Sequence, residues 1–157
     1  MTDTQRFMRR AVELARQGMT AGDGGPFGAV VVRRGKIVGE GWNRVLADND
    51  PTAHGEITAI RDAARRLGTF RLDGCDLYTT GEPCPMCLGA VYWARIDRVY
   101  YGFSISDAAA IGFDDAVIYR ELALPPDKRK IICQAMPSEE VRTLMNDFSK
   151  MPDRARY

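Results

Sequence analysis

The chain has 157 residues and almost balanced charge, with 22 basic and 21 acidic side chains and a single histidine. Its hydrophobic content of 45% is ordinary for a globular protein, and its length suits one domain with a buried core. A formal net charge of +1 argues against a broad nucleic-acid surface, so a nucleic acid is not the expected partner.

The N-terminus and the cysteines indicate a cellular compartment. No uncharged apolar run is long enough to cross a membrane, and residues 1–6 lack the apolar core of a signal peptide. The expected location is therefore the cytoplasm, without a membrane partner. In that compartment four cysteines are more often thiols or metal ligands than disulfides.

The spacing of apolar residues predicts helices that alternate with strands. Helices are expected over about 4–17, 54–67 and 84–94 and from Ser138 onward, and strands over 27–33, 36–42, 76–80, 98–102 and, at a sheet edge, 130–134. Gly18 and Gly68 are the expected stops of the first two helices. This order predicts an α/β fold with three α/β/α layers around a central mixed sheet.

The segments outside these elements are less regular. Residues 21–26 consist of turn formers, which suit either a flexible link or a backbone that passes close to a ligand. Residues 44–52 form a polar loop, and the tail 151–157 has no periodicity. The last helix carries an apolar stripe that we expect to be core, formed by Val141, Leu144, Met145 and Phe148.

Two short motifs carry the chemistry. His54 is the only histidine, and Cys84 and Cys87 form a Cys-x-x-Cys pair. One imidazole and two thiolates are the three protein ligands of an open tetrahedral zinc site, whose fourth position a water takes. Glu56 follows His54 by two residues and suits a proton carrier for that water. The combination of H-x-E with P-C-x-x-C is the signature of zinc nucleobase deaminases.

The spacing of these residues constrains where they can lie. Side chains at i and i+2 do not share a helix face, so His54 and Glu56 can approach one metal only from the opening turn of a helix. Cys84 and Cys87, at i and i+3, share a face at the start of another helix. Two helix N-termini directed at one point favour thiolates over thiols, which zinc binding requires.

Other interpretations of the cysteines remain open at this point. Cys75 or Cys133 could supply a fourth ligand and make the zinc site structural, although each is more often a small buried apolar residue. A thioredoxin-like redox pair would explain Cys-x-x-Cys, but it leaves His54 and Glu56 without a role.

Nearly the whole chain resembles the bacterial guanine deaminases of the cytidine-deaminase-like superfamily. The runs that carry this resemblance are 24–30 (GGPFGAV), 49–54 (NDPTAH), 82–90 (EPCPMCLGA), 92–95 (YWAR) and 112–115 (GFDD), together with the terminal tyrosine. The resemblance implies one zinc-dependent deaminase domain over 1–157, which converts guanine to xanthine and ammonia with one zinc ion per chain.

The resemblance also implies roles for individual residues. It assigns His54, Cys84 and Cys87 to zinc, Glu56 to proton transfer and Asp115 to a second acid near the leaving amine. Phe27, Asn43 and Trp93 would line the purine pocket. The resemblance further implies a homodimer, in which residues 151–157 would cross to the neighbouring subunit and place Tyr157 over its site.

Simpler interpretations exist for three of these residues. Asp115 could cap the helix that follows it, Trp93 could be core, and Tyr157 could be a frayed end. The sequence also departs from the family at Gly55, where alanine is usual, and a methyl group is thereby removed from what we expect to be the pocket floor.

The substrate has several alternatives. The His-Gly-Glu order resembles fungal-type cytosine deaminases, and guanosine, triazines and pterins share an amino-bearing ring carbon with guanine. Deamination of adenosine in tRNA would require a basic surface, for which residues 128–130 and the C-terminal arginines offer only a modest surplus. A non-catalytic zinc-stabilised binding module would have no use for Glu56.

Overall fold

The computed structural model describes residues 2–156, and the chain divides into two compact units after Tyr119. The helices are α1 (Asp3–Ala21), α2 (Val45–Asp48), α3 (Gly55–Leu67), α4 (Pro85–Ala94), α5 (Ile105–Ala110), α6 (Ala116–Ala123) and α7 (Glu139–Lys150), with a short 3₁₀ helix η1 at Pro126–Lys128. The strands are β1 (Gly28–Arg33), β2 (Lys36–Trp42), β3 (Cys75–Gly81) and β4 (Arg98–Phe103).

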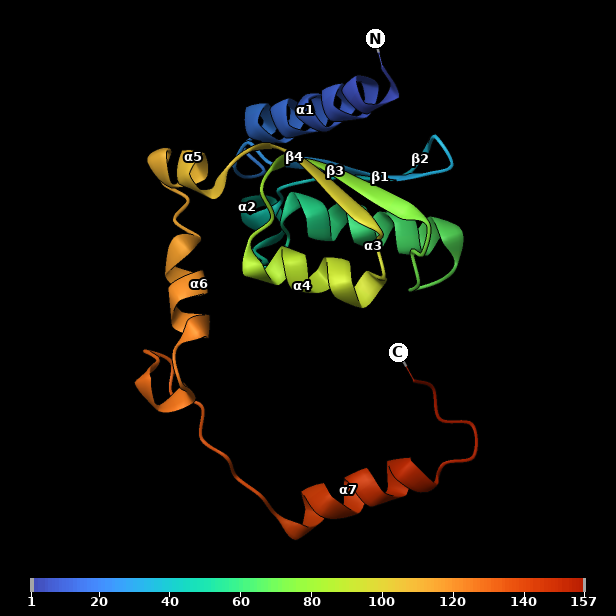
Figure 1. The fold of residues 1–157 in the computed structure, drawn as a ribbon, viewed down its shortest axis with the longest axis vertical. Coiled ribbons are helices and arrows are strands. Elements are labelled where there is room, and N and C mark those ends of the chain that lie inside the picture. The colour runs from blue at the N-terminus through green and yellow to red at the C-terminus, as the bar shows by residue number, and fades with distance from the viewer. Residues whose placement is uncertain (1, 157) are drawn as a thin grey trace. The chain divides into compact units, whose positions relative to one another are not determined.

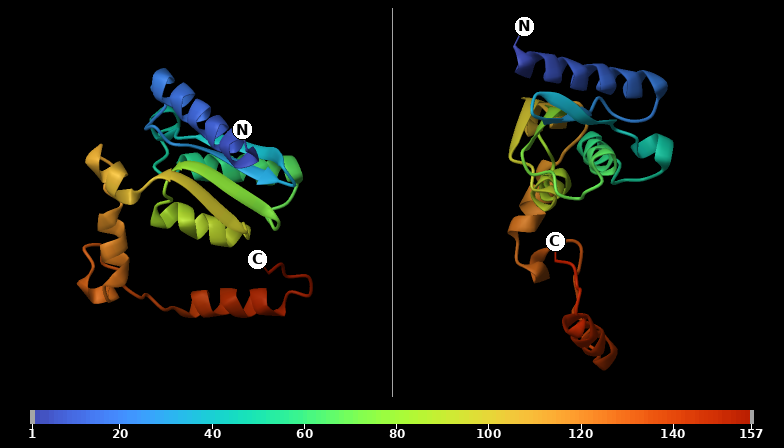
Figure 2. Two further views of the ribbon diagram at one scale, coloured as in Figure 1. Left: turned by 45° about the horizontal axis from the view of Figure 1, so that its top comes forward. Right: turned by 90° about the vertical axis from the view of Figure 1, so that its right-hand side faces the viewer.

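The first unit is a three-layer α/β/α structure, as predicted. Its sheet has the order β2-β1-β3-β4, in which β1 is antiparallel to both neighbours and β3 is parallel to β4. Helix α1 covers one face of the sheet, and α3 and α4 cover the other (Figures 1 and 2). The central sheet is therefore mixed, with the β1–β2 hairpin as its antiparallel part.

Both faces of the central strands are buried, which explains their uninterrupted apolar runs. Ala29 and Val31 on β1 belong to the core cluster that contains Ala59 of α3, whereas Val30 belongs to the cluster that contains Phe7 of α1. Successive side chains of a strand point to opposite faces, so one strand serves two cores.

One edge of this sheet collects the segments that matter for function. Strands β3 and β4 end there, and β1 begins there because it is antiparallel to β3. The hydroxyl of Thr80 joins the strands at this edge: it accepts a hydrogen bond from Gly28 N–H at 3.1 Å and donates one to the Pro26 carbonyl at 3.1 Å. Open α/β sheets keep their sites at the carboxyl ends of their parallel strands.

The structure corrects several predicted boundaries. Helix α1 continues through Gly18 and ends at Gly22, whose left-handed φ of 78° provides the cap. The polar loop 44–52 contains the short helix α2. The predicted edge strand 130–134 is wrong: Ile131 and Ile132 are 79% and 84% exposed, and no strand of the described chain pairs with that segment.

The second unit, described over residues 120–156, is rich in exposed apolar side chains. The Arg129 guanidinium donates to the carbonyls of Glu121, Leu122 and Leu124, and the Glu121 carboxylate accepts from Lys130 N–H at 2.7 Å. The prediction that the α7 stripe is core is wrong for the single chain. Its four apolar residues are 49–69% exposed.

No helix within residues 2–156 is both long enough and apolar enough to span a bilayer.

Candidate active site

His54 and Cys84 each lie at the start of a helix. His54 is the N-cap of α3 and Cys84 is the N-cap of α4, each with extended backbone angles. Neither side chain makes the usual capping hydrogen bond to its own helix. The imidazole and the thiol are therefore directed past the helix ends, as the i, i+2 and i, i+3 spacings predicted.

The two helix starts bring three donor atoms together. His54 Nδ1 lies 3.6 Å from Cys84 Sγ and 3.5 Å from Cys87 Sγ, and the three ligand atoms all lie within 4.8 Å of one another. Tetrahedral zinc with ordinary Zn–S and Zn–N bonds separates a sulfur from a nitrogen by about 3.6 Å. The donor set and its spacing therefore fit a zinc ion.

A fourth protein ligand is not part of this group. Among the described residues, the potential metal-binding cluster consists of His54, Cys84 and Cys87 alone. Cys75 begins β3, two residues before Leu77, and belongs with it to the core cluster under α3. The structure thus favours an open zinc site over the structural alternative that Cys75 would complete.

The surroundings of the two cysteines favour a thiolate at Cys84 and a neutral thiol at Cys87. The Cys87 thiol donates toward Cys84, which together with His54 lowers the pKa of Cys84 to about 4 despite burial. The same hydrogen bond and burial raise the pKa of Cys87. The Cys84 sulfur in turn raises the pKa of His54. A thiolate at Cys84 is therefore stabilised at neutral pH, which is the form that binds a metal.

Glu56 lies in the first turn of α3 and is almost completely buried, with 4% of its surface exposed. Burial is the main reason that its pKa is raised to about 7, and a hydrogen bond with its own backbone N–H is the largest effect that opposes this shift. A carboxyl group that changes protonation near neutral pH can both accept and return a proton during one turnover. Glu56 thus has the position and the acidity of a proton carrier.

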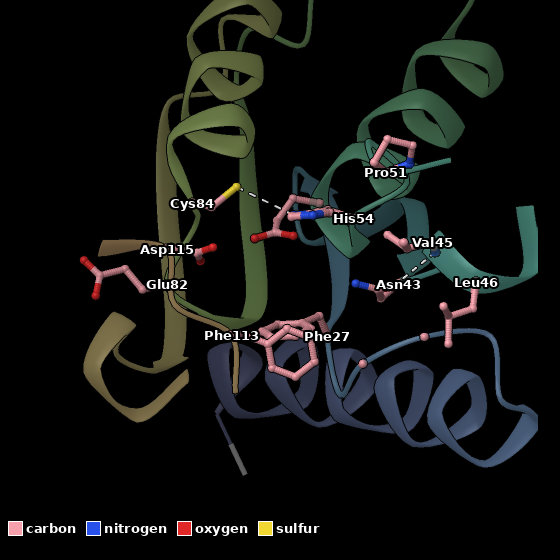
Figure 3. Close-up of a pocket in the computed structure, with 13 residues that line it drawn as sticks. Phe27, Asn43, Val45, Leu46, Pro51, His54, Glu82, Cys84, Phe113 and Asp115 are labelled. Atoms are coloured by element: carbon pink, nitrogen blue, oxygen red, sulfur yellow. Dashed lines mark hydrogen bonds between the residues drawn. The ribbon is translucent and has the colours of Figure 1, made fainter. Parts of the chain in front are cut away.

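A cavity of about 340 Å³ opens at this point, within the usual range for small-molecule sites. Its lining includes six of the predicted site residues: Phe27, Asn43, His54, Glu56, Cys84 and Asp115 (Figure 3). Val45, Leu46 and Phe113 also line the cavity, although the sequence patterns did not indicate them, and Glu82 lines it without a predicted role. Trp93, by contrast, does not line this cavity, and its side chain is 62% exposed on α4.

Two aromatic rings form one apolar wall of the cavity. Phe27 and Phe113 meet edge to face, with ring centroids 4.9 Å apart and an interplanar angle of 86°. Figure 3 shows the pair together on one side of the pocket, opposite His54. Such a wall suits a flat, weakly hydrated ligand such as a heterocyclic base.

Asn43 supplies an oriented polar group. Its side-chain oxygen accepts a hydrogen bond from Val45 N–H at 3.1 Å, and its backbone N–H donates to the Phe27 carbonyl at 2.8 Å. This hydrogen bond orients the side chain so that its amide nitrogen points toward the middle of the pocket (Figure 3). Asn43 can donate to an acceptor on the edge of a ligand.

Two hydrogen bonds hold the segment that carries Asp115. The Glu82 carboxylate accepts from Ile105 N–H at 3.1 Å, and the Tyr119 hydroxyl donates to the Pro83 carbonyl at 3.1 Å. These contacts anchor the chain on both sides of Asp115 to the loop that leads to Cys84. Burial raises the pKa of Asp115.

Asp114, and not Asp115, provides the side-chain hydrogen bond that caps the start of α6. There the Asp114 carboxylate accepts a hydrogen bond from Ala116 N–H at 3.2 Å. Asp115 lines the cavity instead, on the same side as Cys84 (Figure 3).

Gly55 does not face the pocket, which corrects the expectation from the sequence. A methyl group at this position would lie 2.9 Å from the Phe27 carbonyl oxygen and 3.1 Å from its carbon. The glycine therefore lets the start of α3 lie close against the backbone that leads into β1.

We expect Gly55→Ala to lower the free energy of unfolding by about 1 kcal/mol, because crowding against backbone costs more than the added helix propensity returns. The KM for the substrate should stay within about threefold of the native value, since the methyl group does not reach the cavity. Urea unfolding and steady-state kinetics measure the two effects. A large change in KM at unchanged stability would instead indicate that Gly55 lines the substrate pocket.

The site as a whole defines a class of protein. A His–Cys–Cys centre with a buried glutamate beside it is the catalytic arrangement of zinc-dependent hydrolytic nucleobase deaminases. Residues 1–103 match the family model described as the cytidine and deoxycytidylate deaminase zinc-binding region. The chain belongs to this family.

Relatives within the family are similar over most of the chain. The chain is 57% identical to the guanine deaminase of Bacillus subtilis over 125 residues, which are 80% of each protein. The solved structure of that enzyme matches with a TM-score of 0.93 and 48% identity over 98% of both chains. The chain is also 40% identical to the tRNA-specific adenosine deaminase of Buchnera aphidicola over 123 residues, 78% of this chain and 80% of the relative. The resemblance to bacterial guanine deaminases is thus confirmed.

Proposed function

We propose that this protein deaminates guanine to xanthine and ammonia, with one zinc ion per chain. The observation that carries the proposal is the similarity to Bacillus subtilis guanine deaminase over 98% of both chains, including the segment beyond the zinc-binding region. The cavity supports it, because an aromatic wall and one oriented amide donor lie beside the metal ligands.

Each group of the cavity has a part in the proposed reaction. The base lies against the Phe27–Phe113 wall, and the Asn43 amide donates to an acceptor on its edge. Zinc bound by His54, Cys84 and Cys87 supplies Lewis-acid activation of the attacking water. The remaining chemistry is proton transfer by the chain's own carboxyl groups.

Two carboxyl groups divide that proton transfer. Glu56 takes a proton from the attacking water and delivers it to the ring nitrogen, and it then helps to protonate the departing amine. Asp115 faces the cavity from the Cys84 side and assists the amine as it leaves as ammonia. Overall, one water is consumed and a C–N bond is exchanged for a C–O bond.

An ammonia-release screen tests the substrate. Purified zinc-loaded protein is offered guanine, guanosine, cytosine, adenine and a tRNA anticodon stem, and guanine should give the highest kcat/KM. The similarity to a tRNA-specific adenosine deaminase makes tRNA the most informative competitor. Release from the anticodon stem or from cytosine without release from guanine would refute the proposed substrate and leave the zinc chemistry intact.

The proposal extends to the assembly. We propose a cytoplasmic homodimer in which residues 151–157 reach the neighbouring subunit and Tyr157 covers its site. The exposed apolar stripe of α7 and the exposed Trp93 support a second subunit as their cover. Tyr157 itself lies outside the described residues, and the contact of Trp93 with substrate stays a prediction.

Subunit mixing tests this assembly. A chain truncated after Lys150 should be inactive alone, and so should a full-length Glu56→Gln chain. Hybrids of the two should recover activity, because the intact tail of one subunit then reaches the intact site of the other. Full activity of the truncated chain alone, or a monomeric mass in sedimentation, would contradict the proposal.

A further inference from the structure

Asp23 joins three elements through its hydrogen bonds. Its backbone N–H donates to the Gly18 carbonyl at 2.9 Å and so completes the end of α1. Its carboxylate accepts from Trp42 Nε1 at 2.7 Å and from the Arg44 guanidinium at 3.4 Å, at the end of β2. The carboxylate thus ties the loop after α1 to residues on either side of Asn43.

The carbonyl of Asp23 completes this junction. It accepts the backbone N–H groups of Leu46 at 3.0 Å and of Ala47 at 3.2 Å, in the first turn of α2. A helix start leaves such N–H groups without partners inside the helix. Asp23 therefore fixes α2, and with it the Leu46 side chain, relative to the end of β2.

The residues beside this junction line the cavity, although Asp23 itself does not. Gly24 and Leu46 are both part of the cavity wall, as is Asn43 between the two side chains that Asp23 binds. A Cβ on Gly24 would lie 2.0 Å from Asn43 Oδ1, so the loop packs directly on the amide. The position of the loop therefore limits how the Asn43 amide can turn.

We propose that Asp23 is a positioning residue for substrate binding: its junction holds the Asn43 amide and the Leu46 wall in the geometry that receives the base. Asp23 is not among the metal ligands or the residues that line the cavity. Its loss should therefore weaken binding of the base and leave the chemical step intact. This inference rests on the proposed role of Asn43 as a substrate contact.

The test compares Asp23→Ala with Trp42→Phe, which removes the indole N–H and reduces the fused ring system to a single ring. Each variant should raise the KM for guanine about tenfold, the scale of one lost hydrogen bond to a charged group. The kcat should stay within about twofold, and zinc should remain at one per chain, because an effect confined to binding changes KM alone. Asp23→Asn, which keeps an acceptor for Trp42, should recover most of the native KM.

Two further comparisons separate positioning from general stability. Asp48→Ala removes the other carboxylate that Arg44 binds, at 2.7 Å, and should leave KM within about twofold. In an Asn43→Ala background, Asp23→Ala should raise KM by clearly less than about tenfold, since the part of its effect that acts through the Asn43 amide is already lost. A fully additive effect in that background would overturn the proposal.

Other outcomes are equally decisive. An unchanged KM in both Asp23→Ala and Trp42→Phe would refute the role of Asp23, as would a loss of kcat or zinc with KM unchanged. A native protein without guanine turnover would refute the proposed substrate instead. The same set of variants would then be compared on the base that the ammonia-release screen identifies.

Discussion

The Glu56→Gln variant is expected to retain its zinc and to lose about 10³-fold in kcat, within the range that general acid–base groups contribute. Glutamine has nearly the size of glutamate, so the opening turn of α3 and its contacts should persist. It cannot accept a proton from water near neutral pH. Glu56 can accept and return this proton because burial raises its pKa to about 7, and the glutamine side chain has no such titratable group.

The measurement pairs ammonia release with zinc analysis of the same sample. Glu13→Gln, an exposed glutamate on α1, provides a control for the same chemical change far from the cavity. Near-native kcat in Glu56→Gln would remove this residue from the mechanism. Loss of zinc from the variant would show that Glu56 supports the metal site and not only the proton transfer.

Local sequence patterns predicted the centre of the site because its geometry is local. The i, i+2 spacing of His54 and Glu56 and the i, i+3 spacing of Cys84 and Cys87 each require only the start of one helix. That two such starts meet follows from the sheet, since β1 begins where β3 ends. Alternating strands and helices were enough to predict that edge.

The rest of the cavity depends on contacts that spacing does not encode. Leu46 reaches the cavity because a four-residue helix forms on the Asp23 carbonyl, within a stretch that reads as polar loop. Phe113 reaches the cavity through its contact with Phe27, which lies 86 residues earlier in the sequence. Neither arrangement follows from periodicity, although the aromatic within the 112–115 run was a usable signal.

The ends of α1 and the exposure of α7 show a second limit. Glycine often ends a helix, but Gly18 lies inside α1, where a Cβ would meet the Trp42 ring at 2.2 Å. The helix ends instead at Gly22, which adopts the left-handed cap. For α7 the amphipathic pattern correctly predicted a helix, but a pattern cannot tell which layer covers it. In the single chain none of its apolar stripe is buried.

The Cys87→Ser variant is expected to lose zinc, to lose activity by at least about 10³-fold and to unfold at lower temperature. Cys87 is fully buried beside Ile57 and Cys84, and its sulfur is one of the three donors within 4.8 Å of one another. Serine is a poor ligand for zinc, so two donors remain. A metal held at a thousand times its dissociation constant stabilises the native state by about 4 kcal/mol, and that contribution is lost.

Cys75→Ser is the matched control, because it makes the same substitution at another cysteine with no exposed surface. It places a hydroxyl in the core cluster of β3 and should therefore lower stability by about 1–3 kcal/mol. Zinc content and kcat should nevertheless stay close to native. Loss of zinc from Cys75→Ser would identify a fourth protein ligand, and an open position for the attacking water would then no longer exist. Retention of zinc by both variants would place the metal outside the His54–Cys84–Cys87 cluster.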